Sequence, residues 1–275
     1  MIKKLLLLLS SVTILFAATP EQVERYLLLS GSEDQLIEFE QMVDGMGQMF
    51  AARGGSDVPL MQDSQMLPIR FREYIQRNLS EDEMDEVLAN YGHDVLRKLV
   101  SAEVLMEEPD TIQAYRQFRQ QIKDDPLPGS RTETVKAIIK KLYDEKMLTE
   151  FFEKMFLPMV KQMSRAGGKK MTDKQIDALG KRFVKQMRES NYNAMLFMTR
   201  DFTDDELEEL DNLSGNSATS HETRAVFGAI VYAMEEAMHN MADRFAEMLK
   251  NRRHPAVAPR TEGNRTAPKK GRQEL

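Results

Sequence analysis

Apolar residues along the chain recur at the spacing of one face of an α-helix. Between residues 36 and 50 they step by three or four positions, at Leu36, Phe39, Val43, Met46 and Phe50. The same spacing recurs over residues 176–187 and over residues 233–241, the latter within a final helix expected from about 220 to 250. No segment alternates apolar and polar residues as a half-buried strand does. The pattern therefore predicts an all-α fold without a significant β-sheet.

Helix starts are marked by Ser or Thr followed three residues later by Glu or Gln, the capping-box pattern that satisfies two backbone N–H groups. The pattern occurs at Thr19/Gln22, Ser32/Gln35, Ser80/Glu83, Ser130/Glu133, Thr172/Gln175, Thr203/Glu206 and Thr219/Glu222. Pro158 interrupts a helical pattern and is expected to kink or end it. Residues 53–68 are predicted to form a loop, and residues 124–130, which contain two prolines and a glycine, form a linker.

The linker separates two similar halves, which we predict to be helical units over residues 18–123 and 131–250. Near the start of each half, five residues match at an offset of 112: Val23/Val135, Leu27/Ile139, Leu36/Leu148, Glu38/Glu150 and Phe39/Phe151. Further along, residues 79–84 match residues 202–207 at an offset of 123. We expect a duplicated helical unit, with chance similarity between two amphipathic stretches as the alternative.

The segment from Asn78 to Leu99, with a partial copy from Phe202 to Leu210, resembles an exported bacterial family catalogued as domain of unknown function 2059, here as two diverged copies. In that family a Phe-Thr-x-x-Glu-Leu motif begins a helix, which is followed by a short break containing Tyr and then by a second helix. The second half contains this motif, but both halves lack the family's Pro-Ala-Gly sequence at the break. The resemblance covers most of residues 20–108 and, more loosely, 131–240. It implies a helical periplasmic protein and carries over no catalytic residue.

Residues 1–17 have the pattern of a signal peptide, because Lys3 and Lys4 precede an apolar run from Leu5 to Phe16. That run is shorter than the roughly 20 apolar residues that a membrane-spanning helix needs. We therefore expect export to the periplasm, with cleavage after Ala17. An uncleaved membrane anchor is the alternative.

Charge is distributed unevenly along the chain. Residues 18–250 contain 29 basic and 42 acidic residues, whereas residues 251–275 contain seven basic and two acidic ones. The tail has little to bury and is predicted to be disordered. Its cations could contact a membrane surface, an acidic partner or the acidic body itself. No nucleic-acid partner is predicted, because the tail has no aromatic side chain to stack on bases.

Candidate chemistry is sparse. The absence of cysteine excludes a disulfide scaffold, a thiolate metal site and a cysteine nucleophile, and no metalloprotease, P-loop, hydrolase or dinucleotide-binding motif occurs. His93 and His221 each precede a carboxylate at roughly equivalent places in the two halves; His239 lies in the final helix and His254 in the tail. We interpret the first two as polar helix starts, with a base or metal ligand as the alternative. The sequence predicts no catalytic, cofactor-binding or metal-ligating residue and no cofactor.

Methionine, with 20 copies, is the most unusual feature of the composition. It recurs at helical spacing in three segments, at Met42, Met46 and Met49, at Met155, Met159 and Met163, and at Met234, Met238 and Met241. Core packing is the favoured interpretation, since methionine fills irregular gaps. The alternatives are a groove that accepts varied apolar partners and a Cu(I) site, since thioethers are soft ligands.

The leading functional hypothesis is a non-enzymatic periplasmic binding or interaction protein, with a Met/Phe-lined groove between helices that takes a protein or an apolar ligand. It predicts an exposed Met/Phe patch. The alternative of Cu(I) binding predicts at least three converging methionine sulfurs. The second alternative, an enzyme without a recognisable motif, predicts that His93 or His221 lies in a cleft beside another polar group.

Overall fold

The computed structural model describes residues 17–32, 36, 41, 43–45, 48, 61, 63, 65–166 and 170–253. Over these residues the chain is helical and contains no β-strand, apart from an isolated bridge between Ala17 and Ser80, so the all-α prediction is confirmed. The elements are α1 (Pro20–Ser30), α3 (Met66–Asn78), α4 (Glu81–Asn90), α5 (Asp94–Val104), η1 (Leu105–Glu107), α6 (Pro109–Asp124), α7 (Gly129–Leu142), α8 (Glu145–Met155), α9 (Leu157–Ala166), α10 (Asp173–Met198), α11 (Asp204–Ser214) and α12 (Ser217–Arg253).

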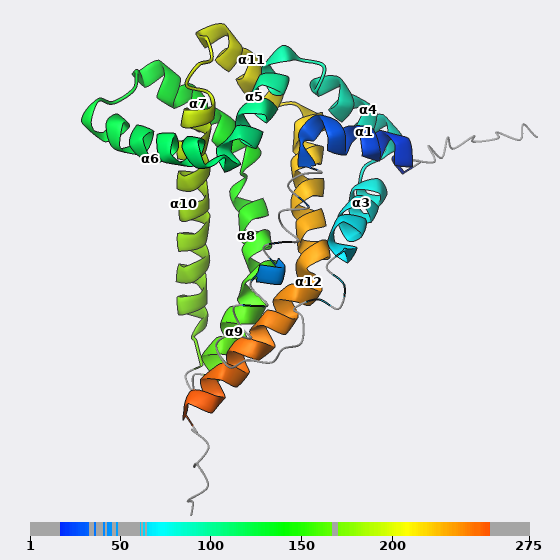
Figure 1. Cartoon of the computed structure of the whole chain (residues 1–275), viewed down its shortest axis with the longest axis vertical. Coiled ribbons are helices and arrows are strands. Elements are labelled where there is room, and N and C mark those ends of the chain that lie inside the picture. Colours follow the sequence, from blue (N-terminus) through cyan, green and yellow to red (C-terminus); the bar gives the residue numbers. More distant parts are fainter. Residues whose placement is uncertain are drawn as a thin grey trace, which may run out of the picture.

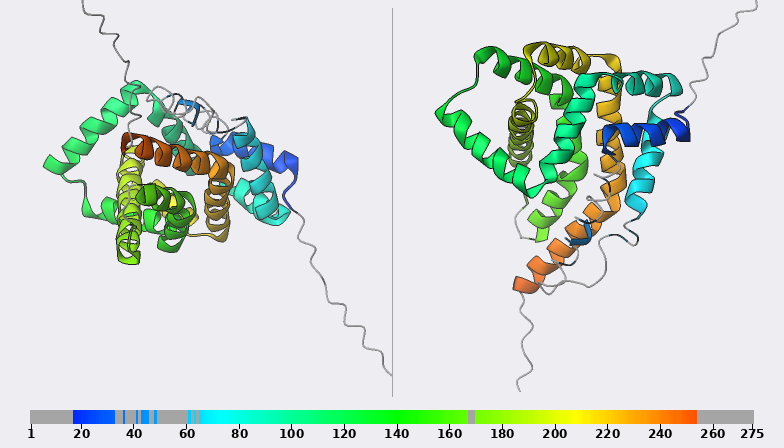
Figure 2. Two further views of the ribbon diagram at one scale, coloured as in Figure 1. Left: turned by 90° about the horizontal axis from the view of Figure 1, so that it is seen from below. Right: turned by 45° about the horizontal axis from the view of Figure 1, so that its top comes forward.

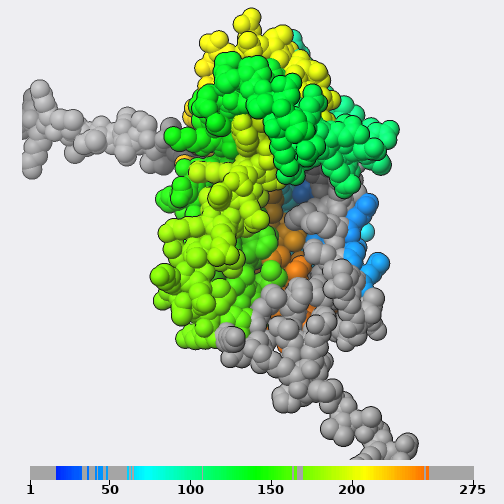
Figure 3. Space-filling model, turned by 90° about the vertical axis from the view of Figure 1, so that its left-hand side faces the viewer, coloured from blue at the N-terminus to red at the C-terminus, as the bar shows by residue number. Residues whose placement is uncertain are grey.

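Three helices, α8, α10 and α12, run along the long axis of the molecule, and the shorter helices α4, α5, α6 and α11 lie across their upper ends (Figure 1). The α6 helix protrudes from this upper layer in both further views (Figure 2). Figure 3 shows the face formed by α10, with part of α12 visible at the bottom of a hollow beside it. No helix in the described part of the chain is long and apolar enough to cross a membrane.

The α12 helix is the central element, because α3, α4, α8 and α9 all pack against it. Its buried face carries alanine at every fourth position, at Ala225, Ala229, Ala233 and Ala237. Such small side chains allow neighbouring helix axes to approach closely, and alanine also has the highest helix propensity. This stripe explains why the helix can serve as a shared packing surface over much of its length.

Among the described residues, two hydrophobic cores hold the helices together, and each draws on both predicted units. The larger core joins α1, α3 and α4 of the first unit to α8 and α12 of the second. The smaller core joins Val95 of α5 to α7, α10 and α11. The predicted linker is the connection between α6 and α7, of which residues 125–128 are outside the helices.

Equivalent helices of the two halves make equivalent contacts. The α1 helix packs on α4 as α7 packs on α11, while α12 packs on α4 and α5 packs on α11. The helix after the break, α5 in the first half and α12 in the second, therefore packs on a helix of the other half. This exchange is what two copies of one unit would produce, and the duplication itself stays a prediction.

Four of the seven predicted capping boxes are present, at Thr19/Gln22, Ser80/Glu83, Thr172/Gln175 and Thr203/Glu206. Gln35 of a fifth lies outside the described residues. The boxes predicted at Ser130 and Thr219 are wrong, because both helices begin earlier. Pro128 precedes α7, and Asn216 accepts a hydrogen bond from the Thr219 backbone N–H at 2.8 Å.

Other boundaries follow the sequence closely. As predicted for Pro158, the helical pattern is interrupted there, with α8 ending at Met155 and α9 beginning at Leu157. The predicted loop over 53–68 extends too far, because α3 begins at Met66 and Pro68 is tolerated in its first turn. The final helix continues to Arg253, three residues into the predicted tail. The signal segment and the rest of the tail lie outside the described residues, apart from Ala17.

Candidate ligand-binding site

A cavity of about 230 Å³ lies where the two halves meet, and we call it the inter-half cavity. The first half contributes α1, α5 and the break after α4, and the second contributes the end of α7, α11 and the first turns of α12. The lining residues are Tyr26, Ser30, Ser32, Tyr91, Leu96, Leu99, Glu103, Leu142, Tyr143, Leu210, Leu213, Ser214, Thr219, Glu222, Thr223, Val226 and Phe227. Most of this wall is apolar, and its polar groups are hydroxyls and two carboxyls.

Glu222 is the central polar residue of the cavity. Because α12 starts at Ser217, Glu222 lies in its second turn rather than at a helix start. Tyr91 donates a hydrogen bond to its carboxylate, and the neighbouring hydroxyl of Tyr26 also lowers the pKa of this carboxyl. The rings of these tyrosines meet edge to face, with centroids 6.0 Å apart. One carboxyl thus joins an element of the second half to two aromatic residues of the first.

The protein environment shifts the acid–base behaviour of this group. Burial raises the pKa of Glu222 to about 7, against the lowering effect of the hydrogen bonds from Tyr91 and Tyr26, and the negative charge of Glu103 raises it further. Burial likewise raises the pKa of the Tyr143 phenol to about 12. Near neutral pH, Glu222 is therefore partly protonated. The tyrosines keep their protons there and can donate hydrogen bonds.

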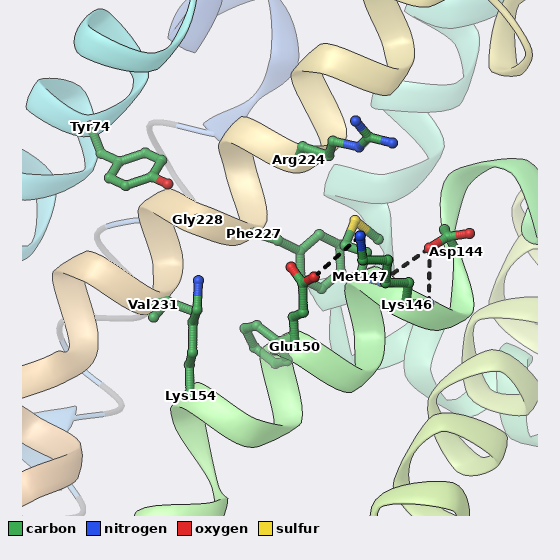
Figure 4. Close-up of a pocket in the computed structure, with 11 residues that line it drawn as sticks. Tyr74, Asp144, Lys146, Met147, Glu150, Lys154, Arg224, Phe227, Gly228 and Val231 are labelled. Carbon is green, nitrogen blue, oxygen red and sulfur yellow. Dashed lines mark hydrogen bonds and ion pairs between the residues drawn. The ribbon is translucent and has the colours of Figure 1, made fainter.

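Phe227 also lines a second cleft, of about 270 Å³, between α3, α8 and α12 (Figure 4). Its charged residues are Asp144, Lys146, Glu150, Lys154 and Arg224. All five are exposed. The Asp144 carboxylate caps the start of α8 by accepting backbone hydrogen bonds, and Nζ of Lys146 lies 3.9 Å from Oε1 of Glu150. Exposed charges of this kind are hydrated and screened, so the inter-half cavity is the better candidate for a built site.

His93, His221 and His239, the histidines in the described part of the chain, do not line the inter-half cavity. Nδ1 of His93 lies 2.8 Å from Glu209, and Nδ1 of His221 lies 3.0 Å from Glu83, so each histidine pairs with a carboxylate of the other half. His239 lies 3.6 Å from Asp243 on its own helix, and His254 is outside the described residues. The arrangement expected for an enzyme, with His93 or His221 lining a cleft, is not found in the described cavities.

The two histidines are also not positional equivalents, which corrects the sequence comparison. His93 is the residue before α5, whereas His221 lies in the second turn of α12. The residue in register with His221 is Lys98, and Lys98 contacts the capping glutamate of α11, Glu206, as His221 contacts the capping glutamate of α4. Each capping glutamate thus receives a basic residue from the opposite half.

The methionine stripes lie in the larger core wherever the structure describes them. Met155, Met234 and Met241 are buried, and Met159 and Met238 pack beside them. Met42, Met46 and Met49 and the side chain of Met163 lie outside the described residues. Core packing is therefore supported, while the inter-half cavity is lined by tyrosine and leucine rather than by methionine. Among the described residues, no group of three or more His, Asp or Glu side chains could hold a metal ion.

The sequence analysis missed Glu222 as a site residue because it assigned this glutamate to a capping box. Its main partner, Tyr91, is 131 positions away in the chain, so no local pattern connects them. Comparison of the chain with family models, with curated proteins and with solved structures found no match. The resemblance to domain of unknown function 2059 therefore stays a prediction, and the candidate site rests on its own geometry.

Proposed function

We propose that this protein is a non-enzymatic binding protein that holds a small molecule in the inter-half cavity. The observation that carries the proposal is the composition of the cavity wall, in which both halves place apolar side chains around one hydrogen-bonded carboxyl. Binding sites for small molecules commonly combine an apolar wall with a few placed polar groups. This revises the hypothesis of a Met/Phe groove while keeping its class of function.

The size of the cavity limits the ligand. At roughly 30 Å³ for each water-sized group, a cavity of about 230 Å³ has room for about eight non-hydrogen atoms. A folded protein segment would not fit there. The proposal therefore commits to a small organic molecule rather than to a protein partner.

The proposed compartment is the periplasm. The support is the basic and apolar pattern of residues 1–17, together with the lack of cysteine. A fusion of the full chain to a reporter that is active only after export tests this part of the proposal. Export that is lost when residues 1–17 are deleted supports it, and a reporter that stays inactive with the full chain contradicts it.

The binding function is tested by thermal shift measurements with neutral, cationic and anionic molecules of up to about ten non-hydrogen atoms. We expect one class to raise the unfolding temperature. Replacing Leu213, which lines the cavity, with Trp should abolish that response, whereas the matched change of Leu105 to Trp on exposed η1 should keep it.

Circular dichroism checks that the L213W variant is folded, and Leu99→Phe, which fills the cavity from α5, is the second variant. The proposal is wrong if no probe stabilises the parent protein. It is also wrong if filling the cavity leaves the response unchanged.

A further inference from the structure

We infer that the molecule held in the inter-half cavity is a small organic cation, an ammonium group carried on an apolar body. This inference rests on the proposed binding function and specifies its ligand. The geometry behind it is the grouping of Glu222, Glu103 and three tyrosines in one apolar cavity.

The described residues that line the cavity carry charge of one sign. Among them, Glu103 and Glu222 are the charged ones, and none is Lys, Arg or His. The ion pairs of the described residues do not include Glu222. A desolvated carboxylate is costly unless an opposite charge or hydrogen-bond donors compensate it. A ligand that brings a positive charge would compensate the carboxylate of Glu222.

The aromatic residues of the cavity also favour a positively charged ligand. Tyr26 and Tyr91 flank the carboxyl of Glu222, and Tyr143 lies against Phe227 with ring centroids 6.2 Å apart and an interplanar angle of 86°. Aromatic rings attract cations through their negative faces. Carboxylates combined with tyrosine rings are therefore a cation-binding combination rather than one that suits a neutral ligand.

The rest of the wall selects the body of the ligand. Leu96, Leu99, Leu213 and Val226 provide apolar surface, which favours a ligand with a hydrocarbon or aromatic body, because apolar surface is removed from water on binding. An anionic ligand would instead face Glu103 and Glu222 at short range. A fully polar cation, such as a hydrated metal ion, would leave these leucines without a partner.

Proton exchange at Glu222 gives the inference a second signature. Because the pKa of Glu222 is raised to about 7, the site is partly protonated at neutral pH. A bound ammonium group favours the ionised carboxylate, so binding near pH 7 should release about half a proton for each ligand bound. Affinity should rise between pH 6 and pH 8, while an alkylammonium probe stays charged.

The test is isothermal titration calorimetry of the protein with benzylamine and with benzyl alcohol, which have the same shape but differ in charge. We expect benzylamine to bind at least ten-fold more tightly than benzyl alcohol at pH 7.5. Glu222→Gln should remove this preference, whereas Glu208→Gln, an exposed change on α11 outside the cavity, should keep it. Titrations in phosphate and in Tris at pH 7 should differ in heat by the buffer ionisation of about half a proton, because Glu222 is about half protonated there.

The outcomes separate the two proposals. If both probes bind equally, the ligand is not a cation while the binding function stands. If E222Q keeps the preference for benzylamine, Glu222 does not select the ammonium group and the inference is wrong at its central residue. If neither probe binds, and no other small molecule stabilises the protein, both proposals fail. The comparison of benzylamine with benzyl alcohol on the parent protein decides the charge question even if a variant does not fold.

Discussion

Asn90 and Asn216 form a reciprocal amide pair across the junction of the two halves. The side-chain amide of Asn216 donates to the carbonyl of Asn90 at 2.9 Å, and that of Asn90 donates in return at 3.4 Å. Asn90 also donates to the hydroxyl of Thr219 at 3.2 Å. Since Asn216 is the cap of α12, this pair fixes where α12 begins relative to α4. The start of α12 in turn places Glu222 opposite Tyr91.

Removing one member of the amide pair should destabilise the protein. Asn90 is buried, and Asn90→Ala leaves the Asn216 amide without its acceptor. We expect a loss of about 1–3 kcal/mol in the free energy of unfolding, because a buried polar group left without its partner costs that much. Urea denaturation measures it. Asn212→Ala, at an exposed position of α11, should stay within about 0.5 kcal/mol, and an equal loss in both variants would contradict the role of the pair.

The two halves should remain together after the chain is cut between them. Asp125, Pro126 and Pro128 are exposed, so a protease site introduced at residues 125–128 would be accessible. We expect the two fragments to elute as one particle in size-exclusion chromatography and to separate only in denaturant, because both hydrophobic cores draw on both halves. Two independently folded fragments that separate without denaturant would overturn this view.

Local patterns in the sequence predict much of the fold. They do not predict the inter-half cavity, because its residues are distant from one another in the chain. The boxes at Ser80 and Thr203 are readable because capping depends on residues three positions apart. Thr219 and Glu222 have the same spacing, but the amide of Asn216 caps α12 first, and Glu222 is left to face the cavity. Whether a glutamate caps a helix or lines a cavity thus depends on a competing cap and on Tyr91, which is distant in the chain.

Stability should depend on pH through Glu222. The pKa of Glu222 is about 7 in the folded protein, against an ordinary glutamate pKa of 4.5. Between these values the folded state binds more protons, so the contribution of Glu222 to stability is fully present below about pH 4.5, is lost as pH rises through 7, and is level above. A shift of this size corresponds to about 3 kcal/mol.

The Glu222→Gln variant should therefore match the parent protein near pH 5 and exceed it in unfolding temperature at pH 8. Glutamine keeps an acceptor for Tyr91 but has no charge to desolvate. Glu208→Gln, at an exposed position, should follow the parent curve. An unfolding temperature for E222Q that lies below the parent value at pH 8 would show that the ionised carboxylate is stabilising there.

A final prediction concerns the close approach of Tyr74 to Gly228 in the second cleft (Figure 4). A Cβ atom at position 228 would lie 2.3 Å from the hydroxyl oxygen of Tyr74. Gly228→Ala should therefore displace the tyrosine, costing about 1–3 kcal/mol for overpacking against a gain of about 1 kcal/mol in helix propensity. In a Tyr74→Ala background the same change should stabilise the protein, since only the propensity gain remains.

The double-mutant cycle in urea isolates this contact, because the predicted effect of Gly228→Ala changes sign with the residue at position 74. Gly180→Ala on α10 is the matched control, since a Cβ there would meet Phe152 at 3.3 Å and not Tyr74. Its effect should add to that of Tyr74→Ala within about 0.5 kcal/mol. Additive behaviour of Gly228→Ala with Tyr74→Ala would mean that the tyrosine does not rest on α12. The cleft between α3 and α12 would then be wider than the structure has it.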